Sequence, residues 1–176
     1  MDFVLQPLLE NEFVKLVPLK EEDFEILYKA ASDPLIWEQH PNKNRWQREV
    51  FQNFFKGAME SKGAFIIYNT KTNEVIGSSR FYDWNEEKSN VSIGYTFYTR
   101  SHWGGKYNPS AKQLMIQHAF KYVDAVIFHI GADNIRSQKA IERLGAKKIA
   151  EEEMAYYGED TKLNFVYEIG KIVFKS

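Results

Sequence analysis

The sequence contains no cysteine and little proline or glycine, with five prolines and ten glycines in 176 residues. The absence of cysteine excludes disulfide frameworks, thiolate nucleophiles and cysteine-ligated zinc sites. The scarcity of proline and glycine, beside 44% apolar and 15% aromatic residues, excludes a fibrous repeat and argues against disorder. We therefore expect one globular domain that spans residues 1–176.

Membranes and nucleic acids are both unfavourable partners for this chain. No apolar run approaches the roughly 20 residues that a membrane-spanning helix needs, and the first residues are acidic where a signal peptide needs basic ones. The net charge is −1, from 23 basic and 24 acidic side chains that interleave along the chain. The sequence therefore predicts a cytoplasmic protein whose main partner is not a nucleic acid. A local group such as Arg100, Lys106 and Lys112 could still hold a phosphate.

Hydrophobic periodicity divides the chain into two halves of different character. The first half predicts one strand, two helices and then three antiparallel strands, because its apolar spacing changes from helical to alternating. These elements are expected at residues 13–17, 21–31, 47–62, 64–68, 74–82 and 91–98. The second half predicts helix, strand, helix and two final strands, at residues 108–122, 125–130, 134–145, 147–157 and 163–174.

Two signals define the starts of the helices in the second half. Asn108-Pro109 predicts the first start, since asparagine can cap free N–H groups and proline is tolerated in the first helical position. Asn134 predicts the second start, and Gly145 the end of that helix. The final two strands are expected to flank a turn at residues 158–161.

Segment 100–108 combines adjacent glycines with basic side chains and joins a predicted strand to a predicted helix. Gly104 and Gly105 allow a ligand to approach the backbone, and the free N–H groups of a helix start attract anions. The helix dipole adds about 0.3–1 kcal/mol for each nearby negative charge. The segment is suited to a pyrophosphate, and in isolation an ordinary turn is an equally good interpretation.

Asn134 and Ser137 lie three positions apart at the start of the last predicted helix. Both side chains can therefore act at the same helix end. A cap at Asn134 beside an inert Ser137 is the simpler interpretation of this pair, because asparagine is a common N-cap residue.

Taken together, the two strand-to-helix units resemble the GNAT acetyltransferase superfamily. The first unit opens with the glycine-rich loop, and the second opens with Asn-x-x-Ser and ends in Leu144-Gly145. The similarity extends from Phe13 to about Ile172 and includes segments 75–81 and 92–97 on consecutive strands. Within the superfamily, the sequence looks most like the branch related to the ribosomal-protein-alanine N-acetyltransferases.

The resemblance implies a mixed α/β (α+β) fold, with a six- to seven-stranded mixed sheet flanked by about four helices. The sheet would be splayed between its fourth and fifth strands, here 91–98 and 125–130, and the pantetheine arm of acetyl-CoA would lie in the splay. The implied activity is direct attack of an amine on acetyl-CoA in a ternary complex, without a metal. The amine could belong to a protein N-terminus or a small molecule, and relatives often form homodimers.

The resemblance also assigns a role to each candidate site residue. The backbone of Tyr95, Thr96 and Phe97 would pair with pantetheine. Asn134 would hydrogen-bond the pantetheine arm and Ser137 would lie near the thioester sulfur or the phosphates, so these two are also the candidate catalytic residues. The loop that would hold the pyrophosphate through its N–H groups consists of Trp103, Gly104, Gly105, Lys106, Tyr107 and Asn108.

The sequence departs from the family pattern in the loop and at the usual acid and base positions. Lys106 and Asn108 stand where relatives usually have glycine or alanine, so we expect a variant loop geometry. Ile141 replaces a tyrosine that protonates the departing thiolate in many relatives, and Ser92 replaces a glutamate that often serves as general base. A catalytically impaired acyl-CoA-binding module is therefore the alternative function.

The missing base favours an acceptor amine of low pKa. A lysine amine with a pKa near 10.4 is roughly 0.04% neutral at pH 7, whereas an α-amino group at about 7.7–8.0 is roughly 10–20% neutral. A coenzyme A thiol titrates near about 8.5 and leaves passably without an acid. Positioning and oxyanion stabilisation would then supply most of the catalysis. Substitute bases exist at Glu151, Glu152, Glu153 and Asp160, although consecutive glutamates are more often solvated surface.

The remaining candidates have simpler interpretations. His118 lies on an apolar helical stripe and His129 in a buried strand, so we expect core histidines without a catalytic role. Arg136 and Lys139 could meet a phosphate, although solvated helix charges are more common. A nucleotide-binding domain is a third interpretation of the loop, but the chain lacks the Gly-Lys-Ser/Thr motif of phosphate transfer. Aromatic residues that could line an acceptor pocket are Trp37, Trp46, Trp103, Phe81 and Tyr82.

Overall fold

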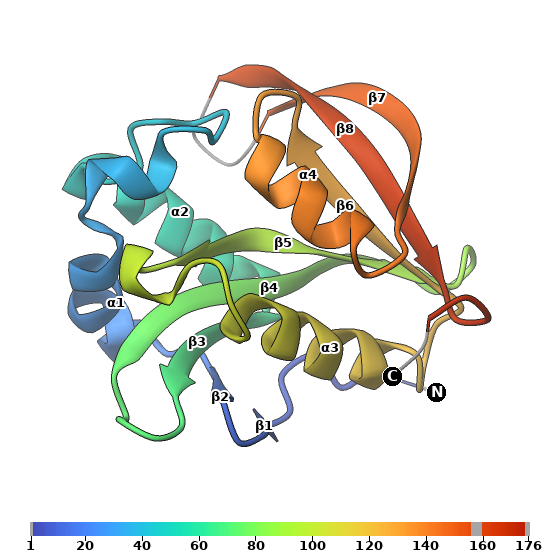
Figure 1. Cartoon of the computed structure of the whole chain (residues 1–176), viewed down its shortest axis with the longest axis horizontal. Coiled ribbons are helices and arrows are strands. Elements are labelled where there is room, and N and C mark those ends of the chain that lie inside the picture. Colours follow the sequence, from blue (N-terminus) through green and yellow to red (C-terminus); the bar gives the residue numbers. More distant parts are fainter. Residues whose placement is uncertain (1, 156–159, 175–176) are drawn as a thin grey trace.

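The computed structural model describes residues 2–155 and 160–174, which form an eight-stranded sheet in the order β1-β2-β3-β4-β5-β6-β8-β7 (Figure 1). Strands β5 and β6 are parallel, and every other neighbouring pair is antiparallel. The strands are β1 (Leu9–Glu10), β2 (Val14–Pro18), β3 (Ala64–Asn69), β4 (Val75–Asn85), β5 (Asn90–Tyr98), β6 (Ala125–Gly131), β7 (Lys147–Ala155) and β8 (Thr161–Gly170).

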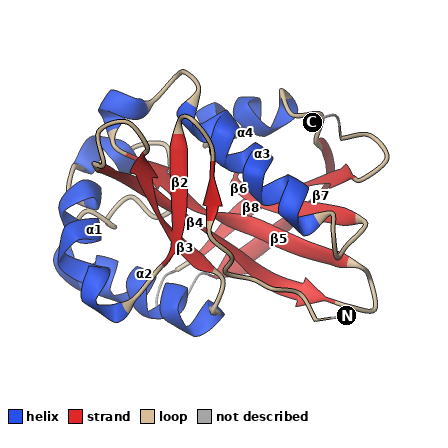
Figure 2. Cartoon of the chain, turned by 90° about the horizontal axis from the view of Figure 1, so that it is seen from below, coloured by secondary structure: helices blue, strands red, loops and turns tan. Residues whose placement is uncertain are grey.

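Helices α1 and α2 cover one face of the sheet, and α3 and α4 cover the other (Figures 1 and 2). None of the helices within the described ranges has the length and apolar character needed to cross a membrane. The helices are α1 (Phe24–Ala31), α2 (Arg48–Ser61), α3 (Tyr107–Ala119) and α4 (Ile135–Glu142), with short 3₁₀ helices η1 (Glu21–Asp23), η2 (Pro34–Trp37) and η3 (Arg100–His102).

Local sequence explains how helices α1 and α2 begin, end and pack. In α2, Phe51, Phe54, Phe55 and Ala58 recur at helical spacing and are buried against the sheet. After α1, the Asp33 side chain accepts a hydrogen bond from the backbone N–H of Leu35, and Pro34 occupies the first position of η2. This cap redirects the chain into η2, which places Trp37 in the core.

The mixed α/β fold class and the four α-helices agree with the prediction from sequence. The sheet has one strand more than the predicted upper count, because the two-residue strand β1 pairs with β2. Two residues are too few to produce an alternating pattern, so the sequence carries no signal for β1. The last two residues of the strand predicted at 147–157 and the first two of the turn predicted at 158–161 lie outside the described residues.

The start of α3 differs from the prediction. The helix begins at Tyr107 with Lys106 as its N-cap residue, and no side chain caps it. Asn108 therefore lies inside the first turn rather than at the cap. Pro109 is tolerated there because the N–H groups of the first turn have no partner within the helix.

Candidate functional site

The sheet opens between its two parallel strands. Strands β5 and β6 pair only at Asn90–Ala125, Val91–Val126 and Ser92–Ile127, and then diverge. A cavity of about 530 Å³ occupies the opening and is lined by both strands, by the loop after β5 and by the first turns of α3 and α4. The splay between these strands therefore agrees with the prediction from sequence.

A β-bulge interrupts β5 where the strand borders the cavity. Between the pairs Ser78–Phe97 and Arg80–Gly94, β5 has one more residue than β4. Tyr95 lies in this stretch with a φ of 54°, in the left-handed region that non-glycine residues seldom adopt. A bulge leaves a residue outside the regular ladder, so the backbone of this stretch is available to a ligand in the gap.

The loop after β5 presents its main chain to the cavity. Gly104 has a φ of 59°, and a Cβ on Gly104 or Gly105 would meet no atom within 4 Å. Both glycines line the cavity, as do Trp103 and Asn108. This arrangement leaves the start of α3 open to an anion.

Two of the predicted loop residues direct their side chains elsewhere. The Nζ atom of Lys106 lies 4.5 Å from the ring centroid of Phe13, and the Tyr107 hydroxyl accepts a hydrogen bond from Asn69 at 3.4 Å. Neither residue lines the cavity. Only the main-chain N–H groups of these two residues, at the helix start, are therefore available to the predicted anion site.

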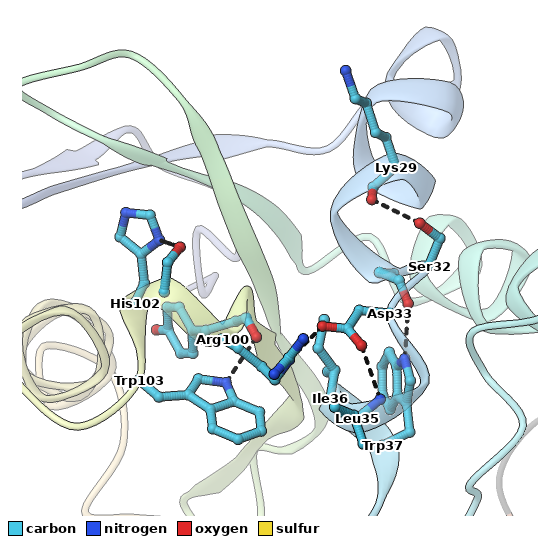
Figure 3. Close-up of polar contacts among 12 residues, drawn as sticks. Lys29, Ser32, Asp33, Leu35, Ile36, Trp37, Arg100, His102 and Trp103 are labelled. Carbon is cyan, nitrogen blue, oxygen red and sulfur yellow. Dashed lines mark hydrogen bonds and ion pairs between the residues drawn. The ribbon is translucent and has the colours of Figure 1, made fainter.

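Ion pairing and hydrogen bonding hold the loop to its surroundings. Arg100 forms an ion pair with Asp33 in the segment that follows α1 (Figure 3). The Trp103 indole N–H donates to the carbonyl of Tyr98 at 2.9 Å. Since Arg100, Lys106 and the buried Lys112 each have different neighbours, the structure does not gather them into one phosphate cluster.

The first turn of α4 forms the opposite wall of the cavity. Asn134 is the N-cap residue, and its Oδ1 accepts a hydrogen bond from the backbone N–H of Ser137 at 3.3 Å. Both residues line the cavity, and Asn134 is buried. The Arg136 guanidinium stacks 3.7 Å from the ring centroid of Trp103, which joins α4 to the loop.

Two buried polar atoms beside the cavity have no hydrogen-bond partner among the described residues, namely the Tyr98 hydroxyl and Asn108 Oδ1. Burial raises the pKa of Tyr98 far above its ordinary value, so the hydroxyl stays protonated. Because buried polar groups are normally hydrogen-bonded, these atoms are suited to contact the polar groups of a bound molecule.

Lys112 extends from α3 into the wall of the cavity beside the bulge. Its Nζ donates a hydrogen bond of 2.7 Å to Thr96 Oγ1, which lies 2.8 Å from Ser79 Oγ. The residue is only 5% exposed, and this burial lowers the pKa of Lys112 from 10.5 to about 7. From the sequence, Lys112 is expected only as a member of a local group that could hold a phosphate, because no local pattern shows that it points inward.

On the α1–α2 face, the cavity continues beneath the segment between α1 and α2. Trp37, His40 and Arg45 line this part. Arg45 Nη1 lies 3.2 Å from His40 Nε2, and burial together with the charges of Arg45 and Arg136 lowers the pKa of His40 well below its ordinary value. His40 is therefore neutral at pH 7. Of the aromatic residues predicted for an acceptor pocket, Trp37 and Trp103 line the cavity.

The two histidines left without a role by the sequence have different positions. His118 is buried, and its Nε2 lies 2.7 Å from the carbonyl oxygen of Val4, in agreement with a core residue. His129 instead lines the cavity, and its Nδ1 lies 2.9 Å from the Tyr82 hydroxyl. Sequence reasoning missed His129 because the apolar residues around it predict a fully buried strand. In the structure, β6 separates from β5 at this point, which leaves His129 at the cavity.

The positions of the usual acid and base offer no replacement chemistry. Ser92 and Ile141 are both buried, Ser92 within the paired part of β5. Glu151, Glu152 and Glu153 are exposed on β7, as expected for solvated surface. In the described ranges, no three histidine, aspartate or glutamate side chains gather closely enough to hold a metal ion.

The comparisons with known proteins agree with this architecture. A family model described as an acetyltransferase (GNAT) domain matches residues 14–147. A search of curated proteins found no match. Several solved structures share the fold, at sequence identities low enough that the likeness concerns the fold alone.

Three solved structures illustrate that likeness. A GCN5-related N-acetyltransferase from Brucella melitensis has a TM-score of 0.82 at 15% identity, over 96% of this chain and 80% of that one. An acetyltransferase of the GNAT family from Bacillus anthracis has a TM-score of 0.74 at 17% identity, over 93% and 98% of the two chains. RimJ from Mycobacterium smegmatis, solved with CoA-disulfide, has a TM-score of 0.74 at 14% identity, over 94% and 87%.

Proposed function

This chain belongs to the GNAT acetyltransferase family, and from that premise we propose that it is an N-acetyltransferase, transferring an acetyl group from acetyl-CoA to an amine. The amine attacks the thioester directly in a ternary complex. We further propose a single domain over residues 1–176, a cytoplasmic location and a homodimer as the assembly to test. Membranes and nucleic acids have no place in this proposal.

One observation carries the proposal. The gap between β5 and β6 leads from the glycine loop at the start of α3 to the bulge at Tyr95, and a single cavity connects them. A long, narrow molecule with an anionic end fits this shape, since the helix start attracts the anion and the strands border the rest. Acetyl-CoA has this form, and RimJ, which shares the fold, was solved with a CoA derivative.

The residues of this chain can hold each part of acetyl-CoA. The N–H groups of the loop and of the first turn of α3, from Trp103 to Asn108, would bind the pyrophosphate. The backbone of Tyr95, Thr96 and Phe97 would pair with the pantetheine amides, in place of the missing pairing with β6. Asn134, whose Oδ1 already caps α4, would donate from its Nδ2 to the pantetheine arm, with Ser137 beside it.

The reaction then depends on position and on stabilisation of charge. The amine nitrogen forms a bond to the thioester carbonyl carbon, and the oxygen gains negative charge before the carbon–sulfur bond breaks. Main-chain N–H groups of the bulge near Tyr95 would stabilise that oxygen, and such stabilisation is often the largest single contribution to acyl transfer. Asn134 and Ser137, on the other wall, would orient the thioester.

Calorimetry and a thiol-release assay test the proposal together. We expect saturable binding of CoA and acetyl-CoA, and acceptor-dependent release of free thiol with a panel of amines and of peptides with free N-termini. Absence of CoA binding would refute the proposed function. Binding without acceptor-dependent release would favour a catalytically impaired acyl-CoA-binding module, an alternative motivated by Ser92 and Ile141 at the usual base and acid positions.

A further inference from the structure

His129 occupies a particular place in β6, just beyond the point where the strand separates from β5. Ile127 is the last residue of β6 that pairs with β5, and His129 follows it on the same face of the sheet. Phe128 and Ile130 belong to the core that packs beneath α3, so the imidazole lies toward the α1–α2 face. It borders the same cavity as the bulge at Tyr95.

Tyr82 of β4 holds the imidazole from behind. Its hydroxyl lies 2.9 Å from His129 Nδ1, and its ring lies 5.1 Å, centroid to centroid, from the ring of Tyr95. A Cβ on Gly94 would come within 3.2 Å of the Tyr82 ring, so the tyrosine packs directly over the residue before the bulge. Tyr82 does not line the cavity, whereas His129 does. With Nδ1 bound to Tyr82, Nε2 is the ring nitrogen left for the cavity.

Burial and the nearby acidic side chains act on the pKa of His129 in opposite directions. Burial lowers its pKa below the ordinary value, while Glu152 of β7 and Asp83 of β4 act in the opposite direction. Tyr82 and Tyr95 are further titratable groups in this region. The cavity wall also contains His40, Arg45, His102, Lys112, Arg136, Lys139 and Arg143. The net effect is a neutral imidazole at pH 7, which is the form that can accept a proton.

We propose that His129 is the general base of this enzyme and that Tyr82 is the residue that positions it, an assignment that rests on the proposed acetyl transfer. A general base requires the tautomer with its hydrogen on Nδ1, and in that tautomer Nδ1 donates its hydrogen to the Tyr82 oxygen. Nε2 then presents its lone pair to the cavity. The same hydrogen bond persists after Nε2 is protonated, so the ring does not need to move during the reaction.

The proton balance of this step is simple. As the neutral amine nitrogen forms its bond to the acetyl carbon, one of its protons passes to Nε2. The carbon–sulfur bond breaks with its electron pair on sulfur. The proton on the imidazolium then neutralises the thiolate, directly or through solvent, and the products are an amide and free coenzyme A.

Nuclear magnetic resonance of the full chain with ¹⁵N-labelled histidine tests the tautomer without any acceptor. The spectrum of His129→Gln assigns the His129 signals. We expect the neutral ring of His129 to carry its hydrogen on Nδ1, and Tyr82→Phe to produce a mixture of tautomers. A neutral ring with its hydrogen on Nε2 in the wild-type protein would overturn the proposal, because no lone pair would then face the cavity.

Kinetics provide the second test, with alanyl and seryl tripeptides and benzylamine as probe acceptors. General base catalysis contributes about 10²–10⁴-fold, so we expect His129→Gln to lower kcat about 100-fold or more at pH 7. We expect the loss to be smaller for Tyr82→Phe, with its acid limb shifted in the pH profile. Added imidazole should partly restore His129→Ala, which a purely structural role would not allow.

Controls separate this inference from the proposed function. Calorimetry should give His129→Gln a CoA affinity within about twofold of wild type, as expected for a residue that acts only on the acceptor. His118→Gln, at a buried histidine remote from the cavity, should keep wild-type kcat and pH profile. A kcat for His129→Gln within threefold of wild type and an unchanged pH profile would overturn the base assignment, even if CoA binds normally.

Discussion

The two halves of the β5–β6 pair are stabilised in different ways. In the closed half, Asn90–Ser92 and 125–127 exchange regular parallel hydrogen bonds, and Val91 and Val126 are completely buried in the main core. In the open half, the strands separate around the cavity, and β5 contains the bulge at Tyr95. One pair of strands therefore serves both as a core element and as a site wall.

The open half contains features that are unfavourable in an ordinary sheet. They include a tyrosine at positive φ, the buried amine of Lys112, and two polar atoms without a hydrogen-bond partner among the described residues, the Tyr98 hydroxyl and Asn108 Oδ1. Each such feature costs free energy in the absence of a ligand. The comparison indicates that the closed half and its core supply the stability that the open half lacks.

The largest expected effect concerns the pH dependence of stability and originates in the open half. Lys112 has a pKa of about 7 in the folded protein and an ordinary value of 10.5, so the unfolded chain binds more protons between these values. The free energy of unfolding should therefore rise with pH in this window. At 1.36 kcal/mol per pKa unit, the rise in the free energy of unfolding from pH 7 to pH 9.5 is about 3 kcal/mol.

Urea unfolding of Lys112→Met at both pH values measures this contribution. The variant should lose the rise, whereas Lys121→Met, at an exposed position, should keep it. The chosen window ends below pH 10, where ionisation of tyrosines in the unfolded chain would begin to act in the opposite direction. Equal pH dependence in the wild type and Lys112→Met would show that the amine is not desolvated in solution.

The next effect concerns ligand binding in the open half. Ala140 of α4 lines the cavity, so the larger side chain in Ala140→Trp should fill the space proposed for acetyl-CoA. We expect a loss of CoA affinity of at least about 100-fold, or about 2.7 kcal/mol, by calorimetry. Glu142→Trp is the matched control, because this exposed residue of the same helix does not line the cavity. Unchanged binding in Ala140→Trp would place the cofactor elsewhere.

A smaller effect is expected from a substitution in the closed half. Val126 is completely buried, and Val126→Ala removes two methyl groups from the core. The free energy of unfolding should fall by about 2 kcal/mol, from lost burial and the cavity that remains. CoA affinity of the folded variant should be unchanged. A large change in affinity with little change in stability would contradict the separation of the two halves.

The smallest effect separates two roles of Asn134. Asn134→Ala should destabilise the protein by about 1 kcal/mol, because α4 loses its N-cap, and should also weaken CoA binding. Asn134→Asp keeps an oxygen that can cap Ser137 N–H but removes the amide donor. It should therefore retain stability and still bind CoA less well. Wild-type affinity in Asn134→Asp would assign the residue a capping role alone.

Much of the fold could be predicted because its signals are local. Helical spacing of Phe51, Phe54 and Phe55 predicts α2, and the cap at Asn134 predicts the start of α4 correctly. Strand β1 could not be predicted, since a pairing of two residues depends on the position of β2 rather than on a pattern of its own. At α3, the Asn108-Pro109 pair predicts the wrong helix start, because the helix already begins at Tyr107 and Asn108 lies in its first turn.

The candidate site likewise contains some residues that the sequence predicts and others that it does not. The glycine loop and Asn134 with Ser137 have recognisable spacing, and the structure places them on opposite walls of one cavity. Lys112 and His129 have no such spacing. Their sequence surroundings are typical of a helix and a buried strand, and only the splay of the sheet reveals that both border the cavity.

The sequence by itself determined the order of elements, the helix start at Asn134 and the glycine-rich loop, because these depend on contacts between residues close along the chain. Only the tertiary structure decided that Lys112 meets Thr96 and that His129 meets Tyr82. Such contacts join different helices and strands, and their distances follow from strand register and packing over the whole sheet. No local pattern of residues contains that information.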